Sequence, residues 1–267
     1  MPFLNFRGFK IFYRKMGIKT SLPPLIFIHG AWANHLTWFN QLRYFAKYTE
    51  IYAYDLLGHG KSDKPRVEYT AQLYAEILKS IITQLAIKNP ILIGHSLGGG
   101  IAQYFTLKYP NQVQKLVLLC TGVYLSLGRG PIKIHPAVLI FLRKVFSKLR
   151  WSAFLKIMTK MSAKHRIEGI EGVNLEARMA ATCSGKAMLS MVYYLMQYNI
   201  SKQIISLKLP ILFITGTKDT FFGQVPIYRA LPNAKVKIKI GGEHVLHLFN
   251  GEVNKWILEF IESETIQ

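Results

Sequence analysis

The sequence predicts an α/β fold in which a mostly parallel sheet carries helices on both faces. Short, continuous apolar runs recur along the 267 residues, and segments with helical periodicity fall between them. Such runs are typical of parallel strands buried on both faces, and their alternation with helices is typical of crossover connections. One interval between two of the runs is far longer than a single crossover helix requires. This interval predicts a helical insertion.

The predicted elements follow one another in a regular order. Residues 3–16 are typical of an antiparallel pair of strands that turns near Arg7 and Gly8. Amphipathic helices are expected over residues 69–85 and 253–261, where apolar side chains recur at helical spacing. Six further strands are predicted from the apolar runs, over residues 25–29, 51–55, 91–94, 116–120, 211–215 and 236–240.

The long interval separates the strand ending at Cys120 from the strand that begins at Ile211. We therefore expect a core domain built from residues 1–122 and 207–267, with a helical insertion over residues 123–206. Six of the eight Met residues lie in this insertion, together with several aromatic residues. Met and aromatic side chains form an adaptable apolar surface. Packing within the insertion's own core explains them equally well.

Charge is the unusual bulk property of the chain. There are 34 Lys and Arg residues against 14 Asp and Glu, and the formal net charge is +20. Residues 77–167 contain no acidic residue, although fourteen basic residues fall there. The simplest interpretation is a solvated, Lys-rich surface, and a weak association with an anionic membrane surface is the alternative. No nucleic-acid-binding motif accompanies the charge, so nucleic acid is not the expected partner.

Other bulk features bear on compartment and cofactor. No window of about 18 residues is free of charges and helix breakers, and the N-terminal residues lack the unbroken apolar centre of a signal peptide. Cys120 and Cys183 are far apart and lack CxxC spacing, so we expect neither a disulfide framework nor a zinc site. A cytoplasmic protein is the expectation. The sequence does not indicate an oligomeric state.

The motif most suggestive of chemistry is GHSLGG at residues 94–99, directly after a predicted strand. A G-x-S-x-G motif between a strand and a helix forms a nucleophile elbow, in which small flanking residues let the serine oxygen project from a sharp turn. The helix that begins near Leu97 would direct its free N–H groups at a developing oxyanion. Ser96 is therefore a candidate nucleophile, which requires a base and a group that orients the base.

The acid and the base are sought at the carboxyl ends of the strands, where reacting groups gather in an open parallel sheet. The chain contains three aspartates, and Asp219 follows a predicted strand downstream of the serine. Asp219 is favoured over Asp55, for which a role in bracing a loop is expected. Among the eight histidines, His244 lies in the loop that leaves the last predicted strand. His244 is favoured over His247.

These residues resemble the α/β-hydrolase fold superfamily. The resemblance covers nearly the whole chain and rests on motifs in a fixed order: IHGAW at 28–32, DLLGHGKS at 55–62, GHSLGG at 94–99, GTKD at 216–219 and GGEH at 241–244. It implies a mostly parallel eight-stranded sheet, with the insertion as a helical cap. It also implies a catalytic triad and an oxyanion hole. The implied roles are Ser96 as nucleophile, Asp219 as acid, His244 as base, and the backbone N–H groups of Ala31 and Leu97 as oxyanion donors.

The resemblance implies a serine hydrolase without cofactor or metal. A carboxylesterase acting on small to medium apolar esters is the leading expectation. Lipase, lactonase, carbon–carbon bond hydrolase and aminopeptidase activities use the same triad and remain alternatives. A ligand-binding receptor that keeps the fold is the alternative without catalysis. Members often have Gly immediately before the histidine, whereas this chain has Glu243, which can either raise the pKa of the imidazole or face solvent.

Overall fold

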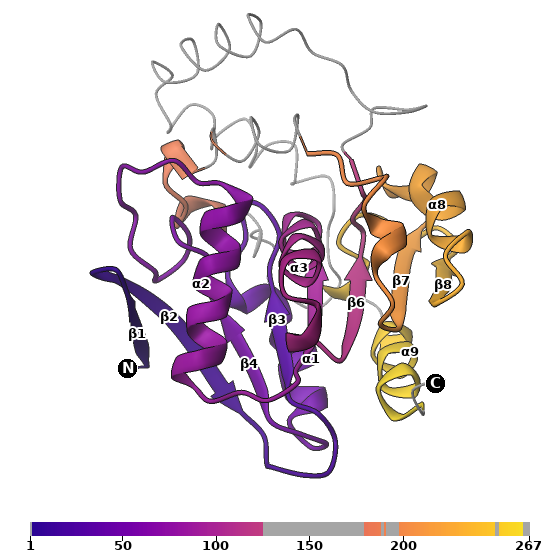
Figure 1. Ribbon diagram of the computed structural model, residues 1–267, viewed down its shortest axis with the longest axis horizontal. Coiled ribbons are helices and arrows are strands. Elements are labelled where there is room, and N and C mark those ends of the chain that lie inside the picture. The colour runs from indigo at the N-terminus through magenta and orange to yellow at the C-terminus, as the bar shows by residue number, and fades with distance from the viewer. Residues whose placement is uncertain (1, 125–178, 188–189, 191–197, 249–250, 264–267) are drawn as a thin grey trace, which may run out of the picture.

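A single eight-stranded sheet forms the centre of the computed structural model (Figure 1). The structure describes residues 2–124, 179–187, 190, 198–248 and 251–263. The strand order across the sheet is β1-β2-β4-β3-β5-β6-β7-β8. The strands are β1 (Phe3–Phe6), β2 (Phe9–Met16), β3 (Leu25–Ile28), β4 (Ile51–Tyr54), β5 (Ile91–His95), β6 (Lys115–Leu119), β7 (Ile211–Gly216) and β8 (Ala234–Lys239).

The mostly parallel arrangement predicted from the sequence is confirmed. Strands β3 to β8 pair in parallel, and β1 and β2 form the predicted antiparallel pair. Strand β2 also pairs antiparallel with β4, which joins the N-terminal pair to the parallel part of the sheet. All residues of β3 to β7 are buried, as the continuous apolar runs predict.

Two hydrophobic cores lie on opposite faces of the sheet, because successive side chains of a strand point to opposite faces. In β3, Ile26 and Ile28 belong to one core, whereas Leu25 and Phe27 belong to the other. Helices α2 (Ala71–Gln84), α3 (Leu97–Lys108) and α8 (Val225–Arg229) cover the first face. Helices α1 (Phe39–Phe45) and α9 (Gly251–Glu262) cover the second. The predicted helices on both faces are confirmed.

Helices α2 and α9 are the two that helical periodicity predicts over residues 69–85 and 253–261. Helix α2 begins after Thr70, whose side-chain oxygen accepts a hydrogen bond from the backbone N–H of Leu73. Helix α9 ends against the buried ammonium group of Lys115, which donates hydrogen bonds to the carbonyl oxygens of Phe260, Ile261 and Ser263. A cation at this position also favours the helix dipole. The C-terminal helix is fixed to β6 in this way.

Most of the predicted insertion, from residue 125 to 178, lies outside the described residues, so its helical character and the domain boundaries stay predictions. Among the parts of the insertion that are described, residues 179–187 pack against the core domain. Thr182 accepts a hydrogen bond from the side chain of Asn34, and the backbone N–H of Ser184 donates to the carbonyl of Gly58. The end of the insertion is thus connected to two loops at the carboxyl edge of the sheet.

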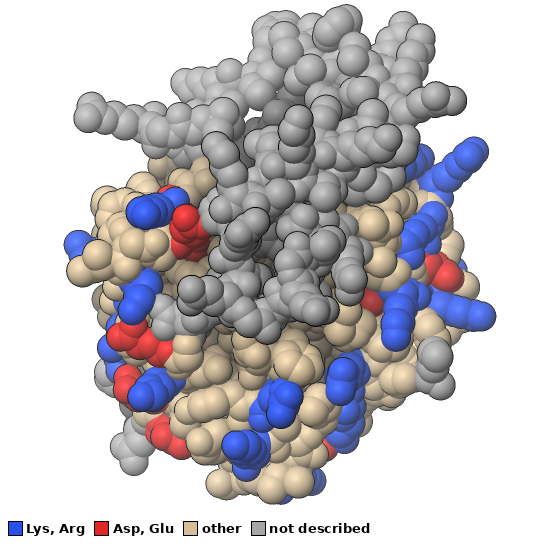
Figure 2. Space-filling model, turned by 180° about the vertical axis from the view of Figure 1, so that it is seen from behind, with Lys and Arg blue, Asp and Glu red and all other residues tan. Residues whose placement is uncertain are grey.

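The basic character of the sequence is visible on the surface. Figure 2 shows Lys and Arg side chains over the face seen there, with fewer Asp and Glu side chains among them. Ten of the fourteen basic residues between 77 and 167 lie outside the described residues. Of the other four, Lys115 is buried. Within the described residues, no helix combines the length and apolar composition needed to cross a membrane. Membrane association and a cytoplasmic location stay predictions.

Candidate active site

Ser96 lies between β5 and α3 in a sharp turn with strained backbone geometry. Its φ of 51° and ψ of −118° are unfavourable for a residue with a side chain. The turn also brings neighbouring backbones into close contact. A Cβ atom on Gly94 would lie 2.5 Å from the carbonyl oxygen of Gly98, and one on Gly98 would overlap the carbonyl oxygen of Ile28. Both glycines are therefore required, as the elbow geometry predicts.

His244 connects the serine to the carboxylate of Asp219. The Asp219 carboxylate can only accept a hydrogen bond, so Nδ1–H of His244 donates to its Oδ1 at 2.8 Å. The proton of neutral His244 then resides on Nδ1, and its Nε2 accepts a hydrogen bond from the Ser96 hydroxyl at 2.9 Å. This tautomer is the one a general base needs, because Nε2 is free to take the serine proton. The structure thus brings the three predicted triad side chains together.

The side chain of Asp219 is buried, whereas that of His244 is partly exposed to solvent. The Asp219 side chain is 0% exposed and the His244 side chain is 37% exposed. Burial opposes ionisation of Asp219, but hydrogen bonds from His244 and Thr215 outweigh it, so the pKa of Asp219 is lowered below its usual value. Thr215, which lies near the end of β7, donates a hydrogen bond to Oδ2 of Asp219 at 2.6 Å. Asp219 is therefore held as a charged carboxylate in a fixed orientation behind the imidazole.

The competing candidates for acid and base have other partners. The carboxylate of Asp55 accepts hydrogen bonds from the backbone and ring of His35, at 2.7 and 2.8 Å, and from the backbone N–H of Lys61 at 2.7 Å. This agrees with the loop-bracing role expected from the sequence. His247 is fully buried, and its Nε2 lies 3.1 Å from the hydroxyl oxygen of Thr37. Neither side chain contacts Ser96 through the hydrogen bonds of the described residues.

Three side chains that surround the triad were not predicted from the sequence. Thr215 ends the apolar run ILFIT, and a hydroxyl residue at that position is a signal from which it could have been predicted. Cys120 is fully buried at the end of β6, where its thiol contacts the carbonyl oxygen of Glu243 at 3.8 Å. His95 is the last residue of β5 and lies next to His244. Its contact with His244 depends on how the end of β5 meets the distant loop that carries His244, which no local pattern reveals.

His95 positions the backbone of the histidine loop. Its Nε2–H donates to the carbonyl oxygen of His244 at 2.8 Å, because a carbonyl can only accept. The His95 ring also packs on the rings of His244 and His247, with centroids 4.9 and 4.3 Å away. Nδ1 of His95 then carries a lone pair, and it has no hydrogen-bond partner within the described part of the chain. Burial, and next the neighbouring imidazoles, lower the pKa of His95 well below its usual value, so the ring is neutral.

The proposed oxyanion donors lie on the two segments that flank Ser96. Leu97 is the first residue of α3, and Ala31 follows Gly30 in the loop after β3. A Cβ atom on Gly30 would lie 3.1 Å from the Cβ of Ser96, so this loop passes directly beside the serine. His29 braces the same loop: its Nδ1–H donates to the carbonyl of Gly30, and its Nε2 accepts from the backbone N–H of Leu56. The oxyanion roles of Ala31 and Leu97 stay predictions.

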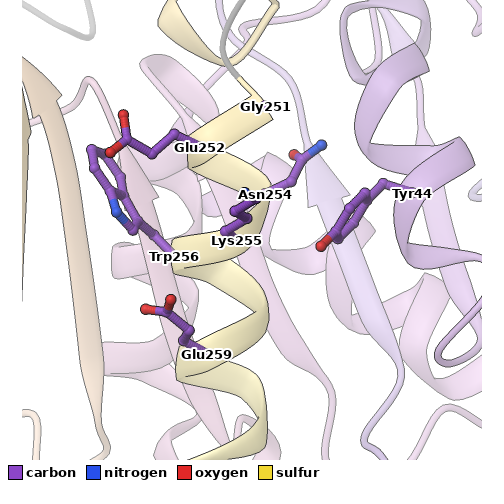
Figure 3. A pocket seen from close by; sticks show the side chains of 7 residues that line it. All are labelled: Tyr44, Gly251, Glu252, Asn254, Lys255, Trp256 and Glu259. Atoms are coloured by element: carbon purple, nitrogen blue, oxygen red, sulfur yellow. The ribbon is translucent and has the colours of Figure 1, made fainter.

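Two further features could hold a ligand. Among the described residues, one group of side chains has metal-ligating atoms close together: the ligand atoms of His95, Cys120 and His244 lie within 4.8 Å of one another. A groove of about 680 Å³ runs along α9 opposite Tyr44 of α1 (Figure 3). None of the residues that line this groove belongs to the triad. They are Tyr44, Gly251, Glu252, Asn254, Lys255, Trp256 and Glu259.

Comparisons with known proteins agree with this architecture. A family model described as alpha/beta hydrolase fold matches residues 23–155. An uncharacterised protein of Mycobacterium tuberculosis strain H37Rv is 27% identical over 262 residues, which cover 91% of this chain and 76% of that protein. A bromoperoxidase from Bacillus anthracis is 23% identical, with a TM-score of 0.79 and 96% of each chain covered. An esterase from Exiguobacterium antarcticum is 21% identical, with a TM-score of 0.80 and coverage of 96% of this chain and 97% of that one.

Proposed function

This chain belongs to the α/β-hydrolase fold superfamily, and we propose that it is a serine hydrolase that cleaves carboxylic esters of small to medium apolar substrates. The observation that carries the proposal is the continuous chain of hydrogen bonds from Ser96 through His244 to Asp219. Nucleophilic catalysis requires this combination of a partly exposed serine at an elbow, a base in the correct tautomer and a buried carboxylate.

The reaction proceeds through an acyl-enzyme. Nε2 of His244 takes the hydroxyl proton as the oxygen of Ser96 attacks the carbonyl carbon of the ester. The carboxylate of Asp219 stabilises the imidazolium that forms. His244 then gives its proton to the alcohol, which leaves, and the acyl group stays on Ser96. Water, deprotonated by the same histidine, attacks the acyl-enzyme and releases the acid.

The backbone N–H groups of Ala31 and Leu97 hold the negative oxygen of the tetrahedral intermediates in this mechanism. Leu97 is suited to this role because the free N–H groups and positive dipole end of α3 point toward its N-terminus. The loop carrying Ala31 lies against Ser96 and is braced by His29, so it can offer a donor without reorganising. One such donor contributes about 10² to 10³ in rate.

An apolar substrate fits the side chains beside the triad. The ring of Phe221 lies 5.7 Å from the ring of His244, and Trp32 of the loop after β3 packs against the hydrophobic core. Within the described residues, Ser96 and His244 are both partly exposed, whereas the side chain of Asp219 is buried. An uncharged acyl or alcohol part suits such surroundings better than a charged one, whose desolvation is costly.

The proposal is tested by p-nitrophenyl esters of increasing chain length. We expect turnover of the short and medium esters, and a loss of about 10⁶ in kcat for Ser96→Ala if the triad acts as a unit. Ser206→Ala, an exposed serine in a short helical turn, is the matched control and should keep full activity. A Ser96→Ala variant that retains most of its esterase rate would contradict the assignment. Lactone and anilide substrates measured alongside separate the lactonase and peptidase alternatives.

A ligand-binding receptor that uses this fold without catalysis is the competing hypothesis. Its pocket would not require an activated serine. A fluorophosphonate probe labels only a serine that acts as a nucleophile, so labelling of the wild-type protein that disappears in Ser96→Ala favours the hydrolase. Absence of labelling, together with no turnover of any ester, would favour the receptor.

A further inference from the structure

Beneath the imidazole of His244 lies a pair of side chains that the proposed reaction does not use. His95, at the end of β5, is 5% exposed, and Cys120, directly after β6, is 0% exposed. With His244 they form a group of three side chains whose ligand atoms lie within 4.8 Å of one another. In a tetrahedral site, zinc is about 2.0 Å from nitrogen ligands and about 2.3 Å from sulfur, so the group needs only a modest contraction to enclose an ion.

The chemistry of these donors suits a metal ion. Metal binding requires a free nitrogen lone pair on the imidazole, and His95 offers one. The lone pair on its Nδ1 has no partner within the described residues. The Cys120 thiol contacts the carbonyl oxygen of Glu243 at 3.8 Å and also interacts with the Asp219 side chain, and a bound ion would replace these weak S–H contacts with a metal–sulfur bond. Two imidazoles and one sulfur are ligands that borderline-soft ions such as Zn²⁺ prefer.

Charge near the cluster favours a cation, although the whole chain is strongly basic. The Asp219 carboxylate interacts with Cys120, so its negative charge would attract a divalent ion bound there. The positive charge of the ion would also stabilise the thiolate form of Cys120. When the metal–sulfur bond forms, the S–H bond breaks and its proton passes to solvent. The ion keeps its oxidation state throughout.

We propose that His95, Cys120 and His244 form an inhibitory binding site for a borderline-soft divalent metal ion such as Zn²⁺. His244 holds Asp219 with one ring nitrogen and Ser96 with the other. Whichever nitrogen binds the ion, one of these two hydrogen bonds is lost, so metal binding and general-base catalysis exclude each other. The ion reaches the cluster past His244, whose side chain is 37% exposed, and so enters from the solvent side of the triad.

The two cysteines of this chain make the proposal directly testable. Cys183 is also buried, and burial raises its pKa to about 12, but among the described residues it belongs to no such group of ligands. Co²⁺ replaces Zn²⁺ in such sites and gives an absorption band when a thiolate binds it. Titration of the wild-type protein with Co²⁺ should produce this thiolate band, which should saturate at one Co²⁺ ion per protein chain. Cys183→Ser should keep the band, and Cys120→Ser should lose it.

Two further measurements complete the test. His244→Gln retains both cysteines and changes a partly exposed side chain, so it should fold, yet it should weaken Co²⁺ binding by at least about 100-fold. Zn²⁺ should inhibit ester turnover in the wild-type protein and in Cys183→Ser, and Cys120→Ser should raise the inhibitory concentration by a similar factor. The spectroscopic readout does not depend on esterase activity, so failure of the proposed function and failure of the metal site are distinguishable.

Clear results would overturn the proposal. A wild-type protein without a thiolate band in Co²⁺ excludes the site, whatever the variants do. A band that survives in Cys120→Ser and disappears in Cys183→Ser assigns the thiolate to the wrong cysteine. If Cys120→Ser does not fold, a thiolate band that persists at unchanged affinity in His244→Gln excludes the proposed ligand set by itself.

Discussion

Replacing Asp219 with Asn should reduce kcat for a p-nitrophenyl ester by about 10³ to 10⁴. The substitution conserves the shape of the side chain and removes its charge. In the wild-type protein, Oδ1 of Asp219 accepts from Nδ1–H of His244 at 2.8 Å, and the carboxylate is completely buried. The variant therefore tests what the charge contributes to the triad.

The magnitude follows from the geometry. Two opposite charges about 4 Å apart interact with about 4 kcal/mol at an effective dielectric constant of ~20, which suits a pair near the protein surface. Loss of this stabilisation when the imidazolium forms corresponds to about 10³ in rate. An amide N–H directed at Nδ1 would also favour the wrong tautomer of His244, with the proton on Nε2 facing Ser96. This second effect extends the expected loss to about 10⁴.

The assay compares kcat and KM of Asp219→Asn with those of two controls. Asp63→Asn changes an aspartate whose Oδ2 accepts from the backbone of Lys10, and it should keep the wild-type kcat. Thr215→Val removes one hydrogen bond to Asp219 but keeps its charge, so a loss of about tenfold is expected. Circular dichroism verifies that each variant is folded. A folded Asp219→Asn protein with less than a tenfold loss of kcat would refute the reasoning about the charge.

Three predictions concern stability. Gly98→Ala should lower the free energy of unfolding by about 1–3 kcal/mol, because the added Cβ atom would overlap backbone atoms at the elbow. Urea unfolding measures the effect, and an unchanged midpoint would contradict this packing. Lys115→Met should lower the free energy of unfolding by about 1–3 kcal/mol, because carbonyl groups at the end of α9 lose a buried donor, and an unchanged value would argue against that cap. Burial lowers the pKa of His29 to about 4, and those of His59 and His247 to about 3. As the pH falls below 6.5, these histidines bind protons in the unfolded chain but not in the folded protein. Each should therefore lower the free energy of unfolding by about 1 kcal/mol at pH 5.5. An unfolding free energy that stays constant between pH 7 and 5.5 would contradict the burial of these rings.

Most of the sheet is predictable from local sequence, because a parallel strand buried on both faces must be a continuous apolar run. Leu25–Ile28 and Ile211–Gly216 satisfy this rule and begin where the sequence predicts. The last strand is shifted: residues 236–240 were expected, whereas β8 covers Ala234–Lys239. It lies at the edge of the sheet and alternates Lys with apolar residues, so its ends are poorly marked. Helices α1 and α8 were not predicted, since they are too short to establish a periodic pattern.

The site is predictable where one motif contains the whole geometric requirement. Gly94, Ser96 and Gly98 form such a motif, because the elbow is local. The surroundings of the triad are not local. Contact of His95 and Cys120 with the loop that carries His244 depends on how the ends of two neighbouring strands and a distant loop meet. Sequence patterns therefore indicate which residues react, but not which side chains lie beneath them.

The most direct measurement is mass spectrometry of the protein quenched with acid during turnover of a p-nitrophenyl ester. The acyl-enzyme mechanism predicts a mass increase of one acyl group, located on the peptide that contains Ser96, and no such increase in Ser96→Ala. Full turnover with the acyl group on another residue, or with Ser96 never modified and Ser96→Ala fully active, would contradict it.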